Sequence, residues 1–94
     1  MGISFLKRLR APIAASEITC TIRIWQRSQV KVGGRYVMEG GFVRITRMRQ
    51  ITLRDITPKL ARESGFAGVV DLLKTAKHGR GEKVYLIEFV YEDA

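Results

Sequence analysis

The chain has 94 residues, of which 46% are hydrophobic and 28% are charged, and its formal net charge is +8. This length excludes two independent cores, so we expect a single domain spanning residues 1–94. The apolar runs are too short to cross a bilayer, which predicts a soluble, cytoplasmic protein of bacterial type with no membrane partner.

The positive charge is concentrated between residues 18 and 54. That stretch holds eight basic residues, seven of them arginines, and a single acid, Glu39. After residue 54, seven acids stand against six basic residues. Because a guanidinium group binds phosphate through a planar fork and stacks on bases, this distribution indicates a face that binds nucleic acid.

The first predicted elements are a short strand over residues 3–7 and one or two helical turns over residues 11–16. Pro12 suits the first position of such a helix. The alternative is one longer helix that begins at Ser4 and that Pro12 would interrupt. Its apolar stripe would consist of Phe5, Leu6, Leu9 and Ile13.

Residues 19–25 are the clearest strand, because β-branched and aromatic residues are frequent there and the side chains alternate strictly between two faces. One face is apolar and should rest on a core: Cys20, Ile22 and Ile24. The other face carries two hydroxyls, a guanidinium and an indole: Thr19, Thr21, Arg23 and Trp25. This second face is either a surface that binds a phosphate and stacks a base, or a solvated face with an arginine–tryptophan contact.

Three further strands are expected, over residues 35–38, 42–53 and 83–91, with a hairpin turn at residues 39–41. The two faces of the second of these strands should carry Val43, Ile45 and Ile51 on one side and Arg44, Thr46 and Met48 on the other. Arg47 and Arg49 break this alternation, which predicts a bulge or a change of burial near them. The last strand is apolar on both faces except at Glu88, which predicts a central position.

Two helices are predicted before the last strand. Thr57-Pro58 combines a capping hydroxyl with proline at the first helical position, and this helix should end at Ser64-Gly65. Residues 66–76 have the apolar spacing of a second helix. The fold class is therefore α+β, a small mixed β-barrel of about five strands with two or three short flanking helices, since closure leaves no long free strand edge.

Residues that usually bind metals are scarce. One cysteine and one histidine supply no ligand cluster, so no metal and no other cofactor is expected. Cys20 is predicted to be a small core residue, because the alternation places it inward. His78 is predicted to lie on the surface at a helix end and not to act as a catalytic base.

Residues 16–23, followed by Val32-Gly33-Gly34-Arg35-Tyr36, resemble the signature of the ASCH domain family, a member of the PUA-like superfamily. The four positions of its short motif hold Ser16, Ile18, Thr21 and Arg23. Residues 51–66 are similar to the helical insertion of the small bacterial single-domain type, and residues 84–91 are similar to its closing strand. The resemblance covers nearly the whole chain. It implies a PUA-like barrel with a cleft beside the signature strand, and RNA or a modified nucleoside as the ligand.

The resemblance also implies a catalytic alternative. Some members of the family hydrolyse N4-acetylcytidine with a lysine, a threonine and a glutamate. The threonine corresponds to Thr21 and the glutamate to Ser64, with Glu63 beside it, so Thr21 and Glu63 are the candidate catalytic residues. The lysine position holds Ile18, and isoleucine can act neither as a nucleophile nor as a base.

The leading hypothesis is an RNA-binding domain that holds RNA or a nucleotide in a basic cleft beside residues 19–25. Trp25 would stack a base, cationic side chains would contact phosphates, and threonine hydroxyls would donate hydrogen bonds. The predicted binding residues are Thr19, Thr21, Arg23, Trp25, Arg27, Lys31 and Arg35.

Two other functions remain open. One is an enzyme, either the modified-nucleoside hydrolase or a ribonuclease that uses the 2′-hydroxyl of RNA with help from Arg23, Lys31, Tyr36 or His78. The other is a module that binds an acidic protein through the basic face. Arg44, Arg47 and Arg49 are expected to form a solvated sheet face.

Overall fold

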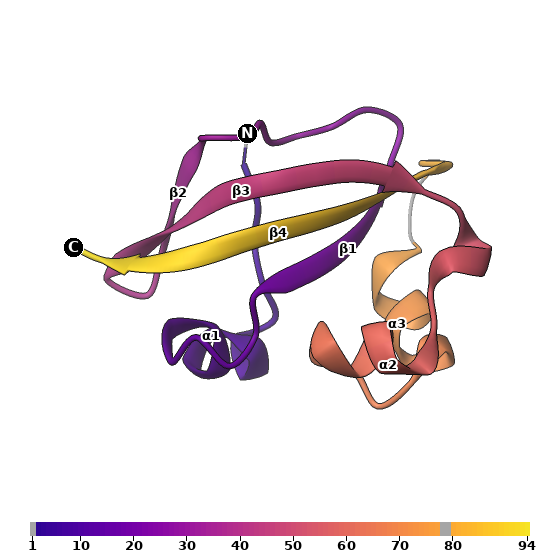
Figure 1. Ribbon diagram of the computed structural model, residues 1–94, viewed down its shortest axis with the longest axis horizontal. Coiled ribbons are helices and arrows are strands. Elements are labelled where there is room, and N and C mark those ends of the chain that lie inside the picture. Colours follow the sequence, from indigo (N-terminus) through magenta and orange to yellow (C-terminus); the bar gives the residue numbers. More distant parts are fainter. Residues whose placement is uncertain (1, 78–79) are drawn as a thin grey trace.

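Strand β4 (Lys83–Asp93) is the strand around which the sheet is built. In the computed structural model, which describes residues 2–77 and 80–94, β4 pairs with β1 (Cys20–Trp25) on one side and with β3 (Gly41–Ile51) on the other. Strand β2 (Arg35–Met38) completes an antiparallel sheet in the order β1-β4-β3-β2 (Figure 1). The nearly continuous apolar run of β4 suits this interior position, which confirms the predicted central strand.

Within the described ranges, three α-helices accompany the sheet: α1 (Lys7–Ala14), α2 (Pro58–Glu63) and α3 (Val69–Ala76). A single 3₁₀ turn, η1 (Leu53–Asp55), connects β3 to α2. The predicted start and end of α2 are confirmed. Thr57 Oγ1 accepts a hydrogen bond from the Leu60 amide at 3.1 Å, and Gly65 takes a φ of +98° just after the helix. Helix α3 begins at Val69, later than residue 66, and the predicted surface residue His78 lies outside the described residues.

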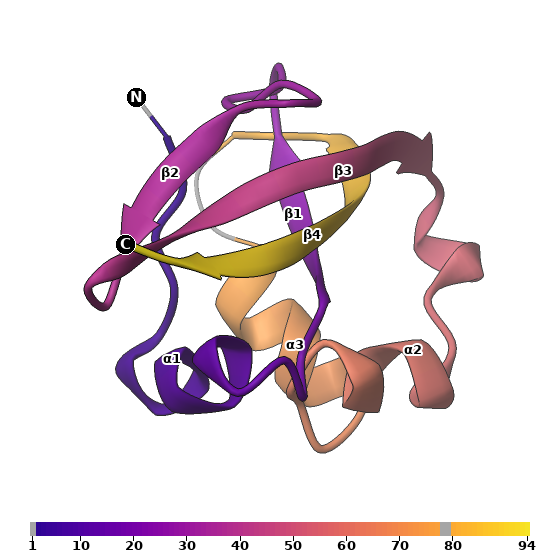
Figure 2. The ribbon, with the colours of Figure 1, turned by 60° about the vertical axis from the view of Figure 1, so that its left-hand side comes forward.

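The sheet curls into a half-barrel (Figure 2). Buried apolar clusters lie on both of its faces. The inner face, toward which all four strands direct side chains, packs on α1 and the N-terminal segment; its buried cluster is Phe5, Leu9, Ile13, Val30, Met38, Val43, Ile45, Tyr85, Ile87 and Phe89. The outer face is covered by α2 and α3 along β1 and one end of β4; its buried cluster is Ile22, Ile24, Ile56, Ala61, Leu72, Val84 and Leu86. The apolar face predicted for residues 19–25 therefore does rest on a core.

The predicted strand over residues 3–7 is wrong. Residues 2–6 have no regular structure, and residues 2–5 make no backbone–backbone hydrogen bond within the described chain. The segment still passes between the two edge strands. The Ser4 carbonyl accepts a hydrogen bond from Arg23 of β1, and residues 2–4 face residues 35–37 of β2 across a hollow of about 510 Å³. The described residues thus form four strands, and a loop segment spans the gap that a fifth strand would close.

Helix α1 contains Pro12, contrary to the prediction that Pro12 would begin a helix. Proline cannot donate a hydrogen bond to the Arg8 carbonyl, but Leu9 and Ile13 on the same helix are only 6% and 1% exposed. Burial of these two side chains outweighs the missing hydrogen bond. The alternative of a helix with a buried Leu9 and Ile13 is therefore closer to the structure, although α1 begins at Lys7 and not at Ser4.

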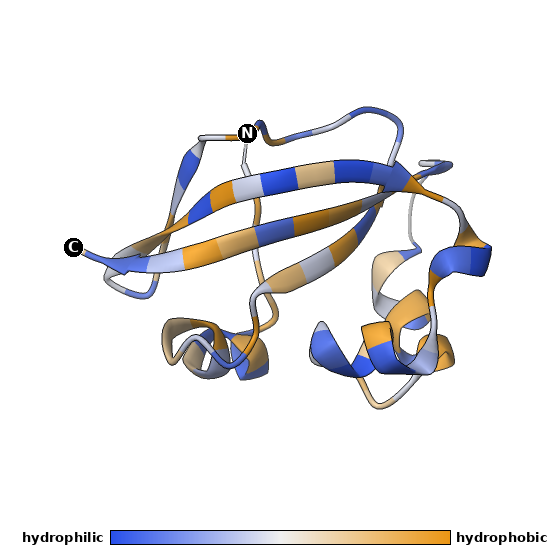
Figure 3. Ribbon diagram, viewed as in Figure 1, coloured by the Kyte–Doolittle hydropathy of each residue, from blue (hydrophilic) through white to orange (hydrophobic). Residues whose placement is uncertain are grey.

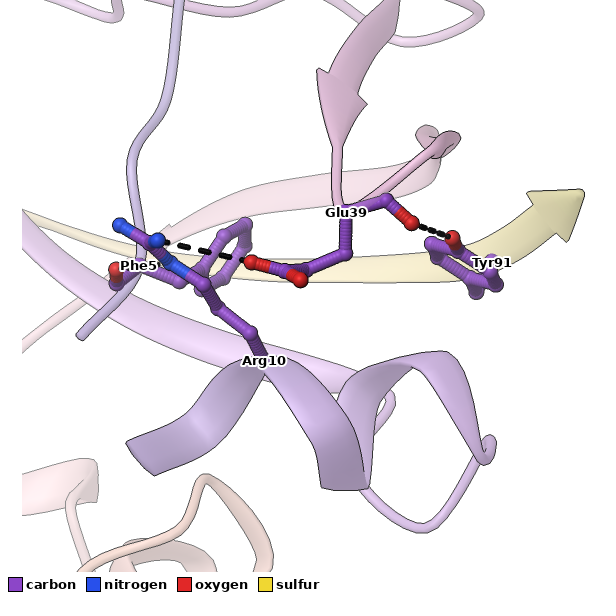
Figure 4. Close-up of polar contacts among 4 residues, drawn as sticks. All are labelled: Phe5, Arg10, Glu39 and Tyr91. Carbon is purple, nitrogen blue, oxygen red and sulfur yellow. Dashed lines mark hydrogen bonds and ion pairs between the residues drawn. The ribbon is translucent and has the colours of Figure 1, made fainter. Parts of the chain in front are cut away.

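Arg10 of α1 connects the N-terminal segment to the β2–β3 hairpin (Figure 4). Its Nε donates to the Phe5 carbonyl at 3.1 Å, and its Nη1 lies 3.5 Å from Glu39 Oε1. The hydroxyl of Tyr91 donates to the Glu39 carbonyl at 2.8 Å. Glu39 and Gly40 have φ angles of +50° and +73°, which form the tight hairpin turn that the sequence predicted.

A β-bulge at Thr46 divides β3 into two halves. The pairing with β4 shifts from Ile45 opposite Phe89 to Arg47 opposite Glu88, which confirms the predicted bulge. One extra residue reverses the alternation of the side chains that follow it. The ribbon coloured by hydropathy shows the apolar and polar residues that succeed one another along β3 (Figure 3). Met48 therefore packs on the inner cluster and Ile51 on the outer one, the reverse of the predicted faces.

No helix in residues 2–77 and 80–94 is long and apolar enough to cross a membrane.

Ile87 tests the inner cluster, because it is 0% exposed at the centre of β4. We expect Ile87→Ala to lower the free energy of unfolding by about 2–5 kcal/mol, through lost burial and the cavity left behind. Urea denaturation followed by circular dichroism measures this. Val37→Ala is the matched control, since Val37 is 76% exposed on the edge strand β2, and it should change stability by less than about 0.5 kcal/mol. Equal effects of the two substitutions would contradict the assignment of the core.

Candidate nucleic-acid interface

A cavity of about 1010 Å³ opens beside β1, an edge strand of the sheet. Three parts of the chain line it: the N-terminal segment from Gly2 to Leu6 with Leu9, the stretch from Thr21 to Gln29, and Phe66 together with Thr75, Ala76, Arg80 and Gly81. Gly81 lies so close to the backbone of β1 that a Cβ atom there would come within 2.7 Å of the Trp25 Cα. The wall of the cavity is therefore built from segments far apart in the sequence.

Arg23 is a half-buried charged residue in the lining of the cavity. Its Nε donates to Thr21 Oγ1 at 3.0 Å and its Nη2 donates to the Ser4 carbonyl at 2.7 Å. Its guanidinium carbon lies 5.0 Å from the centre of the Phe5 ring, a cation–π contact. Its Nη1 donates to no described residue. These contacts fix the guanidinium in one orientation and leave one amino group for a ligand.

The charge of Arg23 has no counter-ion in the cavity. Among the described residues, none of the side chains that line the cavity is acidic. Burial lowers the pKa of Arg23 from 12.5 to about 10, because the charged form loses its hydration and no carboxylate restores that loss. A desolvated cation without a partner favours the binding of an anion.

Trp25 lies on the same face of β1 as Arg23 and also lines the cavity. Its ring centre is 5.8 Å from that of Tyr85, with the two planes tilted by 44°. The side chain is half-buried and packs in part against the inner cluster. The indole thus helps to pack the inner cluster and also borders an open cavity. The guanidinium of Arg23 stacks on Phe5 and not on Trp25, so the expected arginine–tryptophan contact is not found among the described residues.

The rim of the cavity is polar and basic. Gln26, Arg27, Gln29 and Arg80 are exposed and line it. Of the predicted binding residues, four therefore meet at one cavity: Thr21, Arg23, Trp25 and Arg27.

The other three predicted binding residues are not among the cavity-lining residues. Thr19 is exposed, and its carbonyl accepts a hydrogen bond from the Phe89 amide at 3.0 Å. Lys31 is also exposed, and its amide donates to the Tyr36 hydroxyl at 3.1 Å. Arg35 lies on β2, where its guanidinium stacks over Phe42 at 4.4 Å.

The two candidate catalytic residues are not brought together. Glu63 is exposed at the end of α2 and is not among the residues that line the cavity beside Thr21. Burial raises the pKa of the Cys20 thiol to about 11, with smaller contributions from the negative charges of Glu63 and Glu88. Cys20 and Thr21 are neighbours in β1 with side chains on opposite faces.

The other positions taken from the family motif are part of the packing. Ser64 is 2% exposed, and its hydroxyl donates to the Ala61 carbonyl at 2.9 Å. Ile18 is half-buried against the inner cluster, and a Cβ on Gly65 would lie 2.9 Å from its Cδ1.

Three arginines on the outer face of the sheet are paired with acids of β4. Glu92 accepts from Arg35 at 3.1 Å and from Arg44 at 3.0 Å, and Arg47 lies 3.8 Å from Glu88. The solvated basic face expected at Arg44 and Arg47 is therefore partly neutralised. The cause is the antiparallel pairing of β3 with β4, which brings the acidic end of the chain beside its arginine-rich part.

Sequence reasoning missed the cavity-lining residues Ser4, Phe5, Phe66 and Arg80. Ser4 and Phe5 contact Arg23 across a long sequence separation, and only the fold brings them there. The sequence offered one signal for the missed residues: Arg80 is a cation between two glycines of a connecting segment, a setting typical of an exposed binding residue.

Within the described ranges, no three histidine, cysteine or acidic side chains gather closely enough to hold a metal ion. Comparisons of the chain with protein-family models, with curated proteins and with solved structures found no match.

Glu92 provides a test of the outer-face ion pairs. The hydrogen bond from Arg44, followed by the charges of Arg44 and Arg35, holds the pKa of Glu92 below its ordinary value of 4.5. The charged carboxylate therefore stabilises the fold above pH 4.5, and this contribution is lost as the pH falls through the lowered pKa. In a carbon-detected NMR titration we expect Arg44→Gln to move the Glu92 pKa up toward 4.5. Arg49→Gln, which removes an exposed arginine of the same strand that forms no ion pair with Glu92, should leave the Glu92 pKa in place. A pKa unchanged by Arg44→Gln would contradict the pairing.

Proposed function

We propose that this protein binds RNA or a nucleotide in the cavity beside β1, in the manner of an ASCH-type domain of the PUA-like superfamily. The observation that carries the proposal is Arg23: a desolvated guanidinium with an unused amino group, in a cavity whose described residues offer no acid. An oxyanion at this position would supply the missing counter-charge through charge-assisted hydrogen bonds.

The spacing of Arg23 and Trp25 suits one nucleotide. The two residues are separated by one position on the same face of β1, so their Cα atoms are about 7 Å apart along the strand. A phosphate on Arg23 and a base against Trp25 fit this separation, since both groups belong to one flexible nucleotide. Stacking of a base on an aromatic side chain contributes on the order of 1–3 kcal/mol and tolerates any base.

The chemistry of the lining favours binding over hydrolysis. The described residues there provide hydroxyl groups on Ser4, Thr21, Ser28 and Thr75, and three guanidinium groups. They include no carboxylate, lysine or cysteine that could accept a proton or attack a substrate. An amidohydrolase would need a base from elsewhere, and the family lysine position holds Ile18.

The single tryptophan of the chain makes the proposal testable with intrinsic fluorescence. We expect a short single-stranded RNA at low salt to quench Trp25 emission in a saturable way. Arg23→Met keeps the aliphatic length that packs beside Phe5 and removes the donors, so it should weaken binding by about 10- to 150-fold, the value of a charge-assisted hydrogen bond.

Arg49→Gln is the matched control, because Arg49 is an exposed arginine outside the cavity and carries the same charge. It should change the affinity by less than about threefold, in line with an exposed charge. Circular dichroism of both variants establishes that they are folded. An unquenched wild-type protein, or equal losses in the two variants, would overturn the proposal. Tight binding of polyglutamate instead of RNA would identify the acidic-protein module.

A further inference from the structure

We propose that the cavity takes a short unpaired segment of RNA and engages about three of its phosphates, through Arg23, Arg27 and Arg80. This inference rests on the proposed function and specifies its ligand. It confines the contacts between the protein and the RNA phosphates to the cavity, although the whole chain carries a formal charge of +8.

The first argument is the distribution of cations. Among the described residues that line the cavity, the basic ones are Arg23 in the interior and Arg27 and Arg80 at the exposed rim. No acid lies beside them in the lining. In this proposal one phosphate lies on Arg23 and its neighbouring phosphates lie on the two rim arginines.

The second argument concerns the cations that are already neutralised. Arg35 and Arg44 share Glu92, and Arg47 faces Glu88. A phosphate that bound these three arginines would have to displace the acids. It would therefore gain little binding energy on the outer face. These arginines lie on β2 and β3, whereas the cavity opens beside β1, the edge strand at the other end of the sheet.

The third argument is the size and depth of the site. The cavity volume of about 1010 Å³ is at the upper limit of pockets that enclose a drug-sized molecule. One or two nucleotides have the size of such a molecule. Trp25 is half-buried within it, so a base must leave its stack to contact the indole. A base paired within a duplex cannot do so without the cost of unpairing.

The number of engaged phosphates is measured by the salt dependence of the affinity. For a single strand, the slope of log K against log salt concentration is about −0.7 per phosphate, so three phosphates predict about −2. Contacts spread over eight cations, the number of basic residues in the stretch 18–54, would give a slope of about −6. We expect the Trp25 titration to yield the smaller slope, and affinity to stop rising once the oligonucleotide contains about three or four phosphates.

Two further results are expected. Arg27→Gln and Arg80→Gln should each reduce the steepness of the slope by about 0.7, whereas Arg49→Gln should not change it. A blunt duplex of the same sequence should compete at least about tenfold more weakly than the single strand, because its bases are already paired.

The outcomes separate this inference from the function on which it rests. RNA that fails to bind even at low salt would overturn both. RNA that binds with a slope near −6, with affinity that keeps rising with length, or with a duplex as good as a single strand would leave RNA binding in place and overturn the three-phosphate footprint.

Discussion

The hydrogen bond from Arg23 to the Ser4 carbonyl is the interaction on which the cavity depends. It ties an N-terminal segment without regular structure to the edge strand β1, and the Phe5 ring beneath the guanidinium extends the same contact into the inner cluster. Because the segment also lies beside β2, it spans the open side of the half-barrel. The cavity exists because this span is a loop held by side-chain hydrogen bonds from Arg23 and Arg10 and not a fifth paired strand.

The same arrangement gives Arg23 two roles that oppose each other. Its hydrogen bonds to Thr21 and Ser4 and its contact with Phe5 organise the site, while burial of its charge without an acid lowers its pKa and destabilises the charged form. A structural arginine in a sheet would normally acquire a carboxylate, as Arg44 does with Glu92. The absence of one among the described lining residues is what distinguishes the inner site from the outer face.

Much of the fold followed from local patterns. The strict alternation of β1, the two apolar faces of β4, the Thr57-Pro58 helix start and the tight turn at Glu39-Gly40 depend on neighbouring residues, and all were predictable. The errors were at the N-terminus and in β3. At Pro12 the burial of Leu9 and Ile13 overrode a local helix breaker, and at Thr46 one bulged residue reversed the faces of Met48 and Ile51.

By itself, the sequence determined which side chains of β1 share a face, because a strand alternates with a period of two residues wherever it lies. It therefore placed Thr21, Arg23 and Trp25 together. Only the tertiary structure decided what that face meets: the N-terminal segment over Arg23, and Arg80 at the rim of the cavity. It also left Glu63 outside the cavity lining and placed Glu92 beside Arg35 and Arg44. These are contacts between residues far apart in the chain, set by strand pairing and burial, and no local pattern encodes them.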